Sequence, residues 1–370
     1  MSSDPAARAG AVLEIDLGAV VANWRRLAQQ AAPAACAAVV KANAYGLGAS
    51  RVAKALAASG CRLFFVATLE EGIALRAALG PAPEIAIFNG PLPGTEAEFA
   101  THRLIPVLNE PGQIEAWKSQ TKAPAILHID TGMSRLGLSP RDFAALADEL
   151  PRCGIGWRSV ISHLACADTP DHALNEQQRA RFAAVAQRMP GIPASLAASS
   201  GIFLGPAYHF DFVRPGAALY GVNPQPGRPN PMRQTVRLSG KILQVREIDR
   251  GESVGYGAAH VMQKPGRVAT VAVGYADGWL RSLSHRGCGF IGGKRISLLG
   301  RVSMDLVTFD VSAIAVAQAR PGATVELLGE HYGVDDAAAD AGTIGYEILT
   351  ALGARYHRIY RDSSAASPPE

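Results

Sequence analysis

The sequence predicts an α/β protein built as an N-terminal (β/α)8 TIM-like barrel followed by a mostly-β C-terminal domain. Three observations lead to this prediction. The chain has 370 residues, which is too many for one small core and enough for two domains. Short apolar runs alternate with longer amphipathic runs from about residue 36 to residue 221. Beyond residue 233 the chain changes to short runs rich in β-branched residues and broken by Gly and Pro.

The barrel prediction depends on eight apolar runs that carry few polar positions. Strands of a parallel sheet are buried on both faces, so they lack an alternation of apolar and polar residues. The strand candidates are Cys36–Lys41, Leu63–Ala67, Glu84–Phe88, Leu104–Leu108, Ala125–Asp130, Ser159–His163, Pro193–Ala197 and Ala217–Tyr220. Amphipathic stretches such as Arg141–Leu150 and Asn175–Arg188 lie between them and are expected to be helices. A doubly wound sheet is the alternative, but eight strand–helix alternations favour a barrel. The predicted barrel spans residues 17–231.

The C-terminal domain is expected to span residues 232–362. Its strand candidates lie in the runs RLSGKILQVREI, RVATVAVGY, RISLLG, DLVTFDV and ATVELLG. The early segment Ala11–Asp16 is also strand-like, and we expect it to join this domain. Residues 1–10 and 363–370 are expected to be disordered tails.

The composition argues against several classes of protein. The chain is 48% hydrophobic with a formal net charge of +4, and no basic run carries interleaved aromatics, so we expect no nucleic-acid partner. Its five cysteines form no CxxC pair, which favours a reducing compartment. With no signal segment and no bilayer-length apolar run, we expect a soluble, cytoplasmic protein without a membrane partner. The histidines are too scattered for a metal site, so no metal is expected.

Unusual polar residues follow the apolar strand candidates. Their positions are Lys41, Asn43 and Tyr45 after the first strand, Arg135 after the fifth, His163 at the end of the sixth, Ser199 and Ser200 after the seventh, and Arg214 in the loop before the eighth. In a barrel these ends form the C-terminal mouth, where active sites are built. Such convergence from several strands is typical of a catalytic site.

Lys41 is the most informative of these residues. A lysine at a strand end often reaches out to solvent. Lys41, however, opens the motif VVKANAYGLG, whose glycines allow a tight turn and whose Tyr45 can cover a planar ligand. A partly desolvated lysine in such a place suits a Schiff base with an aldehyde cofactor.

Two further motifs have both an ordinary and a functional interpretation. Ser199-Ser200-Gly201 is a common turn sequence, but the loops after the seventh and eighth strands are the usual phosphate sites of a barrel. VAVGYADGW could be a plain β-hairpin. Alternatively, its Tyr275 could be a proton donor if cations lowered its pKa.

Together these motifs resemble the alanine racemase family of fold-type III pyridoxal-phosphate enzymes. VVKANAYGLG is followed, in the family's order, by HIDTGMSRLGL, SHLACAD, VRPGAALYG, VGYADG, GRVSMD and ARYHRIY. The resemblance runs from about Val12 to Arg361. It implies racemisation of L- and D-alanine for cell-wall synthesis, pyridoxal 5'-phosphate as cofactor, and a homodimer with shared active sites.

The resemblance also implies roles for individual residues. Lys41 would bind the cofactor and serve as base on one face of the substrate, with Tyr275 of the partner subunit on the other. Arg214 would face the pyridine nitrogen, supported by His163, and would weaken the ring as an electron sink. The implied cofactor contacts are Lys41, Tyr45, Arg135, His163, Ser199, Arg214, Gly216, Ala217 and Tyr356. The implied substrate contacts are Arg135, Met304 and Tyr275, with Asp305 beside Met304.

One position departs from the family pattern. Many members carry a carbamylated lysine seven residues before the arginine, where this chain has His128. Histidine cannot supply the negative charge of a carbamate, so His128 is expected to support Arg135 differently. We hypothesise that a chloride, a water or a carboxylate fills the place beside Arg135.

Other enzyme classes remain as alternatives. A racemase of another small amino acid such as serine would differ only in its pocket. A fold-type III amino-acid decarboxylase is less favoured, because it places a carboxylate rather than an arginine against the pyridine nitrogen. A pyridoxal-phosphate carrier lacks the second domain. A sugar- or phosphate-processing barrel enzyme would leave Lys41 without a partner.

Overall fold

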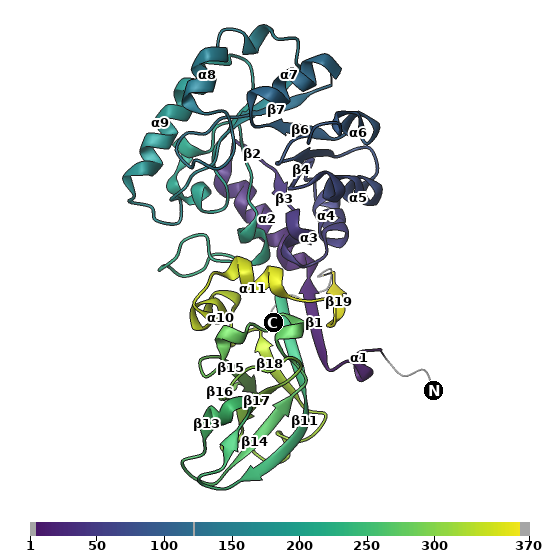
Figure 1. The fold of residues 1–370 in the computed structure, drawn as a ribbon, viewed down its shortest axis with the longest axis vertical. Coiled ribbons are helices and arrows are strands. Elements are labelled where there is room, and N and C mark those ends of the chain that lie inside the picture. Colours follow the sequence, from purple (N-terminus) through teal and green to yellow (C-terminus); the bar gives the residue numbers. More distant parts are fainter. Residues whose placement is uncertain (1–4, 121–122, 363–370) are drawn as a thin grey trace, which may run out of the picture. The chain divides into compact units, whose positions relative to one another are not determined.

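A computed structural model describes residues 5–120 and 123–362 of the chain (Figure 1). The chain divides into two compact units, which we describe separately. The barrel unit contains residues 20–219 and 223–233, and the β unit contains the described residues of 1–19, 220–222 and 234–370.

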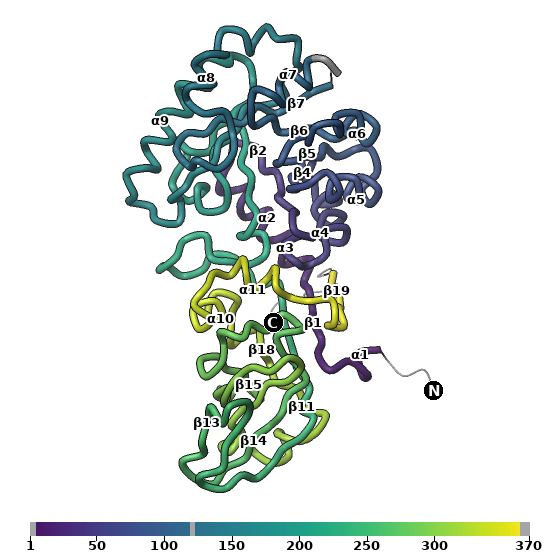
Figure 2. Tube along the Cα trace, viewed as in Figure 1, coloured from purple at the N-terminus to yellow at the C-terminus, as the bar shows by residue number. Residues whose placement is uncertain are grey.

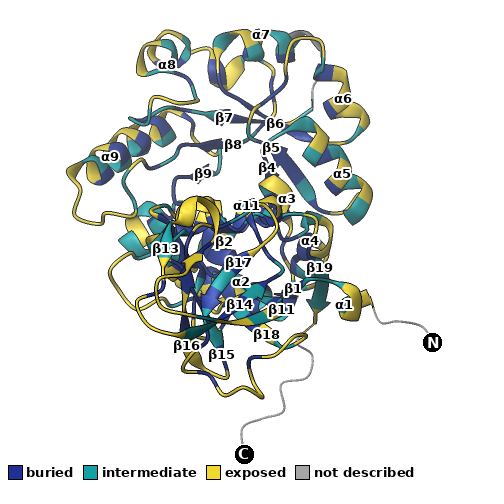
Figure 3. Cartoon of the chain, turned by 60° about the horizontal axis from the view of Figure 1, so that its bottom comes forward, coloured by how far each residue is buried: buried dark blue, intermediate teal, exposed yellow. Residues whose placement is uncertain are grey.

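The barrel unit is built on a parallel sheet of seven short, mostly buried strands. In sheet order they are β3 (Ala38–Val39), β4 (Leu63–Val66), β5 (Glu84–Ile87), β6 (Ile105–Leu108), β7 (Ala125–His128), β8 (Trp157–Ile161) and β9 (Ala194–Ser195). Burial on both faces explains why these segments read as continuous apolar runs. Figure 3 shows the sheet strands in dark blue, whereas the helices carry exposed faces.

Residues 211–215 close this curled sheet into a barrel. The parallel pair there is β2 (Ala35–Cys36) and β10 (Phe212–Val213). The backbone N–H of Ala37 donates to the carbonyl of Val213 at 2.9 Å. On the other side, Asp211 donates to the carbonyl of Ala194 at 3.0 Å. The segment therefore bridges the first and last strands, and the predicted barrel is confirmed.

One helix precedes the first barrel strand, and further helices follow the strands along the chain. They are α2 (Leu17–Ala31), α3 (Lys41–Tyr45), α4 (Ala49–Ala58), α5 (Leu69–Leu79), α6 (Glu96–Thr101), α7 (Pro111–Gln120), α8 (Pro140–Leu146), η1 (Leu150–Arg152), α9 (Ala173–Arg188), η2 (Ser200–Leu204) and η3 (Pro206–Tyr208). The predicted helix Arg141–Leu150 ends earlier, at Leu146. Helix α5 begins with a capping box, in which the Thr68 hydroxyl and the Glu71 carboxylate each accept the other residue's backbone N–H.

The predicted eighth strand is wrong. Ala217–Tyr220 forms a 3₁₀ helix, η4, and the eighth strand is Phe212–Val213. The apolar run AALY reflects complete burial rather than extended structure, because all four of its side chains are within 2% of full burial. Arg214 therefore follows the last strand instead of preceding it. This places Arg214 at a strand's carboxyl end, like the other polar residues.

The β unit contains one eight-stranded sheet. Its order is β14 (Gly266–Val271), β17 (Val307–Asp310), β16 (Lys294–Leu299), β15 (Cys288–Ile291), β18 (Thr324–Leu328), β11 (Val236–Ile248), β1 (Ala11–Asp16) and β19 (His357–Arg361). The long strand β11 also pairs with β14, so six strands close on themselves. Its other elements are the hairpin β12 (Ser253–Val254) and β13 (His260–Val261), the 3₁₀ turns η5 (Tyr256–Ala258), η6 (Tyr275–Asp277) and η7 (Arg281–Leu283), and helices α10 (Val334–Ala341) and α11 (Gly345–Ala351).

The first strand of the chain belongs to the β unit. Strand β1 lies between β11, which runs antiparallel to it, and β19, which runs parallel (Figure 2). Its alternating burial puts Leu13 and Ile15 in the core. Residues 1–4 and 363–370 of the predicted tails lie outside the described residues. Within the predicted tail 1–10, Pro5–Arg8 form a helical turn (α1), whose carbonyls at Ala6 and Ala7 accept from the Lys241 ammonium.

No helix within residues 5–120 and 123–362 is long and apolar enough to cross a membrane.

Candidate active site

Lys41 begins a left-handed turn at the carboxyl end of the first barrel strand. Ala42, Asn43, Ala44 and Tyr45 have φ values of 51°, 54°, 55° and 52°. This conformation costs roughly 1–2 kcal/mol per residue, because Cβ approaches the following carbonyl. Gly46 and Gly48 extend the positive-φ stretch at no such cost. A run of this kind at a strand end indicates that the position of the turn serves a purpose other than stability.

The surroundings of Lys41 favour its neutral amine. Its Nζ lies 5.9 Å from the centroid of the Phe88 ring. Burial lowers the pKa of Lys41, and the positive charge of Arg135 lowers it further, whereas the Glu71 carboxylate raises it. A larger share of the lysine is therefore uncharged at neutral pH than in water. The uncharged amine is the form that attacks an aldehyde.

Three barrel loops converge near Tyr45. The Ser199 hydroxyl accepts from the backbone N–H groups of Gly216 at 3.0 Å and Ala218 at 3.2 Å. A Cβ atom at Gly216 would lie 2.4 Å from the Tyr45 hydroxyl oxygen, so this hydroxyl packs directly on the glycine. The loops after the first, seventh and eighth strands thus bring hydroxyls and amide N–H groups together. This donor set suits a phosphate.

Replacing Gly216 with alanine is expected to weaken cofactor binding at least about tenfold, because the new methyl group displaces the Tyr45 hydroxyl. Titration of the cofactor-free protein with pyridoxal phosphate measures the effect. Gly112→Ala is a matched control, since the new Cβ there meets only the flexible Glu110 side chain. Unchanged affinity in Gly216→Ala would contradict this placement of the phosphate.

Arg214 is a buried cation bound to neutral acceptors. Its exposed fraction is 3%, and it donates to the Ser195 carbonyl at 2.8 Å, to the Ser195 hydroxyl, and to the Ser162 carbonyl at 2.5 Å. Burial lowers its pKa to about 9, so it stays protonated at neutral pH. A buried arginine of this kind can donate to a ligand but cannot give that ligand its proton.

The two predicted histidines remain neutral. Burial and the charges of Arg214 and Arg135 lower the pKa of His163 to about 3. Burial and the same two arginines lower the pKa of His128 to about 3, although Asp130 opposes them. Both side chains therefore offer lone pairs, not charge, to the arginines around them.

Asn109 sets the orientation of the His128 ring. The Asn109 amide nitrogen donates to the carbonyls of Phe88 and Val107, both at 2.9 Å. Its oxygen is therefore free to accept from His128 Nδ1, which lies 2.7 Å away. This assignment leaves His128 Nε2 as an acceptor.

The space beside Arg135 is small. A cavity of about 10 Å³ is lined by His128, Ile129, Asp130, Met133, Arg135, Leu136, Ser162 and His163. It holds about one water molecule. Of the three occupants hypothesised for this place, a water fits the volume. The nearby carboxylate of Asp130 instead accepts the backbone N–H groups of Gly132, Met133 and Ser134, and so shapes the loop that carries Arg135.

In the β unit, Tyr275 lies on a loop that is bonded to the loop of Met304. The N–H of Tyr275 donates to the Ser303 carbonyl at 3.0 Å, and the N–H of Ala276 donates to the Met304 carbonyl at 2.9 Å. Tyr275 is 42% exposed and Met304 54%. Both predicted residues therefore present their side chains outward from one pair of loops.

Asp277 and Arg355 hold these loops in place. The buried Asp277 carboxylate accepts from the Gly274 N–H at 2.8 Å and from Arg355 Nε at 3.1 Å. Arg355 also donates to Asp305 at 2.7 Å. One arginine thus links the Tyr275 loop to the Met304 loop, and Asp305 takes part through this link.

Tyr356 carries an unsatisfied polar atom. Its hydroxyl is buried and has no hydrogen-bond partner among the described residues. Burial and the Asp277 carboxylate raise the pKa of this phenol, so it remains a donor. A buried hydroxyl without a partner costs about 1–3 kcal/mol, and a bound ligand would remove that cost.

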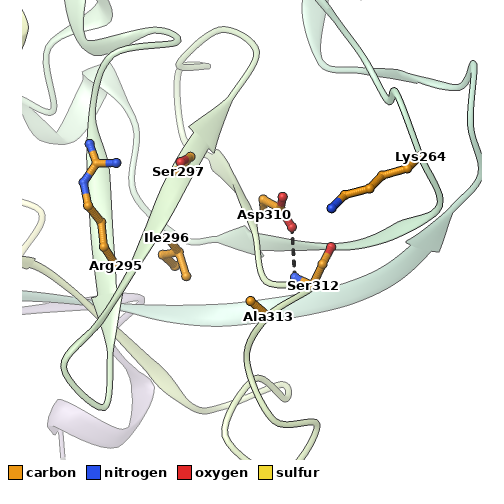
Figure 4. A pocket seen from close by; sticks show the side chains of 7 residues that line it. All are labelled: Lys264, Arg295, Ile296, Ser297, Asp310, Ser312 and Ala313. Carbon is orange, nitrogen blue, oxygen red and sulfur yellow. Dashed lines mark hydrogen bonds between the residues drawn. The ribbon is translucent and has the colours of Figure 1, made fainter.

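A second pocket in the β unit contains none of the predicted residues. Its volume is about 310 Å³, and its lining residues are Lys264, Arg295, Ile296, Ser297, Asp310, Ser312 and Ala313 (Figure 4). Its polar side chains are mostly exposed and of mixed charge, and we assign it no role in the reaction.

Comparisons with known proteins bear on both units. The family model described as "Alanine racemase, N-terminal domain" matches residues 15–224, and "Alanine racemase, C-terminal domain" matches residues 235–360. The chain belongs to the alanine racemase family.

Named relatives of this family cover nearly the whole chain. An alanine racemase of Rhodospirillum rubrum is 53% identical over 360 residues, which cover 95% of this chain and 96% of the relative. A catabolic alanine racemase of Mesorhizobium japonicum is 51% identical, with coverage of 96% and 94%. The alanine racemase of Bartonella henselae, solved with covalently bound pyridoxal phosphate, has a TM-score of 0.92 at 42% identity, with coverage of 95% and 100%.

The resemblance of the sequence to alanine racemases is therefore confirmed, and so is the fold class. The decarboxylase alternative is not favoured by these relatives. Four residues of the site were not predicted from the sequence: Glu71, Asn109, Asp277 and Arg355. Asp277 and Arg355 lie within the motifs VGYADG and ARYHRIY, and Glu71 is the last residue of the capping box Thr68–Glu71, whereas Asn109 left no signal of this kind.

Proposed function

We propose that this chain is a pyridoxal-phosphate-dependent racemase that interconverts L- and D-alanine. The observation that carries the proposal is Lys41, a desolvated amine at the barrel mouth near the Phe88 ring and the charge of Arg135. Two bases are required, because the substrate carbon must regain a proton on the face that did not lose one. Lys41 serves one face and the partner subunit's Tyr275 serves the other.

The described residues fit the cofactor. Lys41 supplies the amine for its aldehyde, and the Ser199 hydroxyl with the amides around Gly216 and Ala217 would hold its phosphate, together with Tyr45. In the β unit, the buried hydroxyl of Tyr356 has no partner among the described residues and is available as a donor to a ligand. Arg214 would donate to the ring nitrogen. When bound, pyridoxal phosphate withdraws electrons and stabilises negative charge at the substrate's α-carbon.

Charge complementarity explains the remaining roles. Arg135 binds the substrate carboxylate, and the neutral His128 and His163 orient the arginines without cancelling their charge. Arg214 cannot pass a proton to the ring nitrogen, so less charge is drawn into the ring. This favours return of the proton to the α-carbon over transamination.

The β unit contributes the second base in a homodimer. Tyr275 and Met304 lie exposed on bonded loops, as expected of residues that complete a site in a partner subunit. The backbone N–H of the partner subunit's Met304 would bind the substrate carboxylate. The chain has five unpaired cysteines, which supports the cytoplasm as its compartment.

The test is incubation of the purified protein with L-alanine in D₂O. We expect D-alanine to accumulate with deuterium at the α-carbon. Turnover of serine or of a basic amino acid, with none of alanine, would retain the fold and overturn the substrate. Absence of reaction with every amino acid, despite bound pyridoxal phosphate, would overturn the reaction class.

A further inference from the structure

We propose that Glu71 is a positioning residue, whose carboxylate anchors the left-handed turn Ala42–Tyr45 and thereby fixes Lys41 and Tyr45 at the barrel mouth. The proposal rests on the function proposed for Lys41. Glu71 lies in α5, after strand β4, whereas the turn follows strand β3.

The turn cannot satisfy all of its own backbone groups. Within it, Ala44 donates to the Val40 carbonyl and Gly46 donates to the Ala42 carbonyl, both at 2.8 Å. The N–H groups of Ala42 and Asn43 are directed instead to Glu71. Because four consecutive non-glycine residues hold positive φ, the turn needs an external acceptor to keep this conformation.

One carboxylate oxygen of Glu71 accepts hydrogen bonds from the turn, and the other accepts hydrogen bonds from the residues just before α5. Its Oε1 accepts from Ala42 N at 2.5 Å and from Asn43 N at 3.4 Å. Its Oε2 accepts from Ala67 N at 2.9 Å and from Thr68 N at 3.4 Å. The carboxylate therefore joins the loop after β3 to the loop after β4. Hydrogen bonds to a charged acceptor are stronger than those to a neutral one.

The capping box of α5 aims the Glu71 side chain. The Thr68 hydroxyl accepts from the Glu71 N–H at 3.3 Å, so the first turn of the helix sets the direction of the carboxylate. The capping box requires only that the Glu71 carboxylate accept the Thr68 N–H. The bonds to Ala42 and Asn43 lie outside the helix and serve the turn.

Charge gives Glu71 a second effect on Lys41. Burial lowers the pKa of the Lys41 amine, the charge of Arg135 lowers it further, and the charge of Glu71 raises it. Lys41 in turn disfavours the charged form of His163. Loss of the Glu71 charge would therefore leave Lys41 easier to deprotonate, while loss of the hydrogen bonds would leave it less well placed.

The experiment compares Glu71→Gln with Glu70→Gln in the full-length protein. Glu70 is the adjacent exposed carboxylate in the first turn of α5, so its replacement makes the same charge change away from the turn. Hydrogen–deuterium exchange of the cofactor-free protein is measured at the amides of Ala42 and Asn43. We expect exchange about tenfold faster in Glu71→Gln and unchanged in Glu70→Gln.

A second readout follows the pH dependence of cofactor attachment. Cofactor-free protein is mixed with pyridoxal phosphate at a series of pH values, and the rate of linkage to the lysine is followed by visible absorbance. Glu71→Gln should shift the midpoint of the plot of rate against pH to lower pH. Glu71→Asp keeps the charge but retracts it from the turn, so its exchange should rise while its midpoint stays near that of the wild type.

Each outcome decides between interpretations. Unchanged exchange at Ala42 and Asn43 in Glu71→Gln overturns the proposal, as does an equal effect in Glu70→Gln. If Glu71→Gln does not fold, Glu71→Asp provides the exchange test. Failure of the wild type to attach pyridoxal phosphate at Lys41 overturns the proposed function, whereas the exchange readout still tests the anchor.

Discussion

Lys41→Ala is expected to lower racemisation at least about 10³-fold and to abolish covalent retention of pyridoxal phosphate. The substitution removes both the amine that holds the cofactor and the base on one face of the substrate. Alanine at the start of the left-handed turn leaves intact the hydrogen bonds that the Ala42 and Asn43 N–H groups donate to Glu71. The loss is therefore chemical and not conformational.

The measurement combines D-alanine formation in D₂O with borohydride reduction and peptide mass analysis. In the wild type, reduction should attach the cofactor to the peptide that contains Lys41. Lys54→Ala, at an exposed position of α4, is the control and should retain full activity. Residual racemisation at more than a few per cent in Lys41→Ala would show that another residue carries this role.

Tyr275→Phe is expected to lower interconversion of the enantiomers about 10²- to 10⁴-fold while leaving cofactor attachment intact. The hydroxyl is the only group removed, and the loop is held by backbone bonds from Tyr275 and Ala276 and by Asp277. The lysine side of the site keeps its base. Consequently, one enantiomer should still exchange its α-hydrogen for deuterium, and the other should not.

Separate incubations with L- and D-alanine in D₂O reveal this asymmetry. Tyr256→Phe changes another exposed tyrosine of the β unit and serves as the control. Equal exchange of both enantiomers in Tyr275→Phe would mean that one base serves both faces. Loss of exchange from both enantiomers would instead point to a damaged Lys41 side.

Local signals were sufficient for much of the barrel. Buried parallel strands produce continuous apolar runs, and polar residues follow those runs at strand ends, so Lys41, Arg135 and His163 could be predicted as candidate site residues in order along the chain. The prediction of a strand at AALY was wrong, because a buried 3₁₀ helix and a buried strand leave the same apolar pattern. Arg214 was consequently predicted to precede the eighth strand, whereas it follows that strand, Phe212–Val213.

What the chain alone reveals about this protein is its family and its fold class, together with Lys41 as the lysine proposed to react, because these depend on local periodicity and contiguous motifs. Only the folded protein shows the left-handed conformation of Ala42–Tyr45, the anchoring of that turn by Glu71, the contact between Gly216 and Tyr45, and the Arg355 link between two loops. These features join residues 28 to 171 positions apart or depend on backbone angles unfavourable for the residues concerned. No periodicity encodes such contacts, since they arise from the packing of distant segments at one barrel mouth or one loop pair.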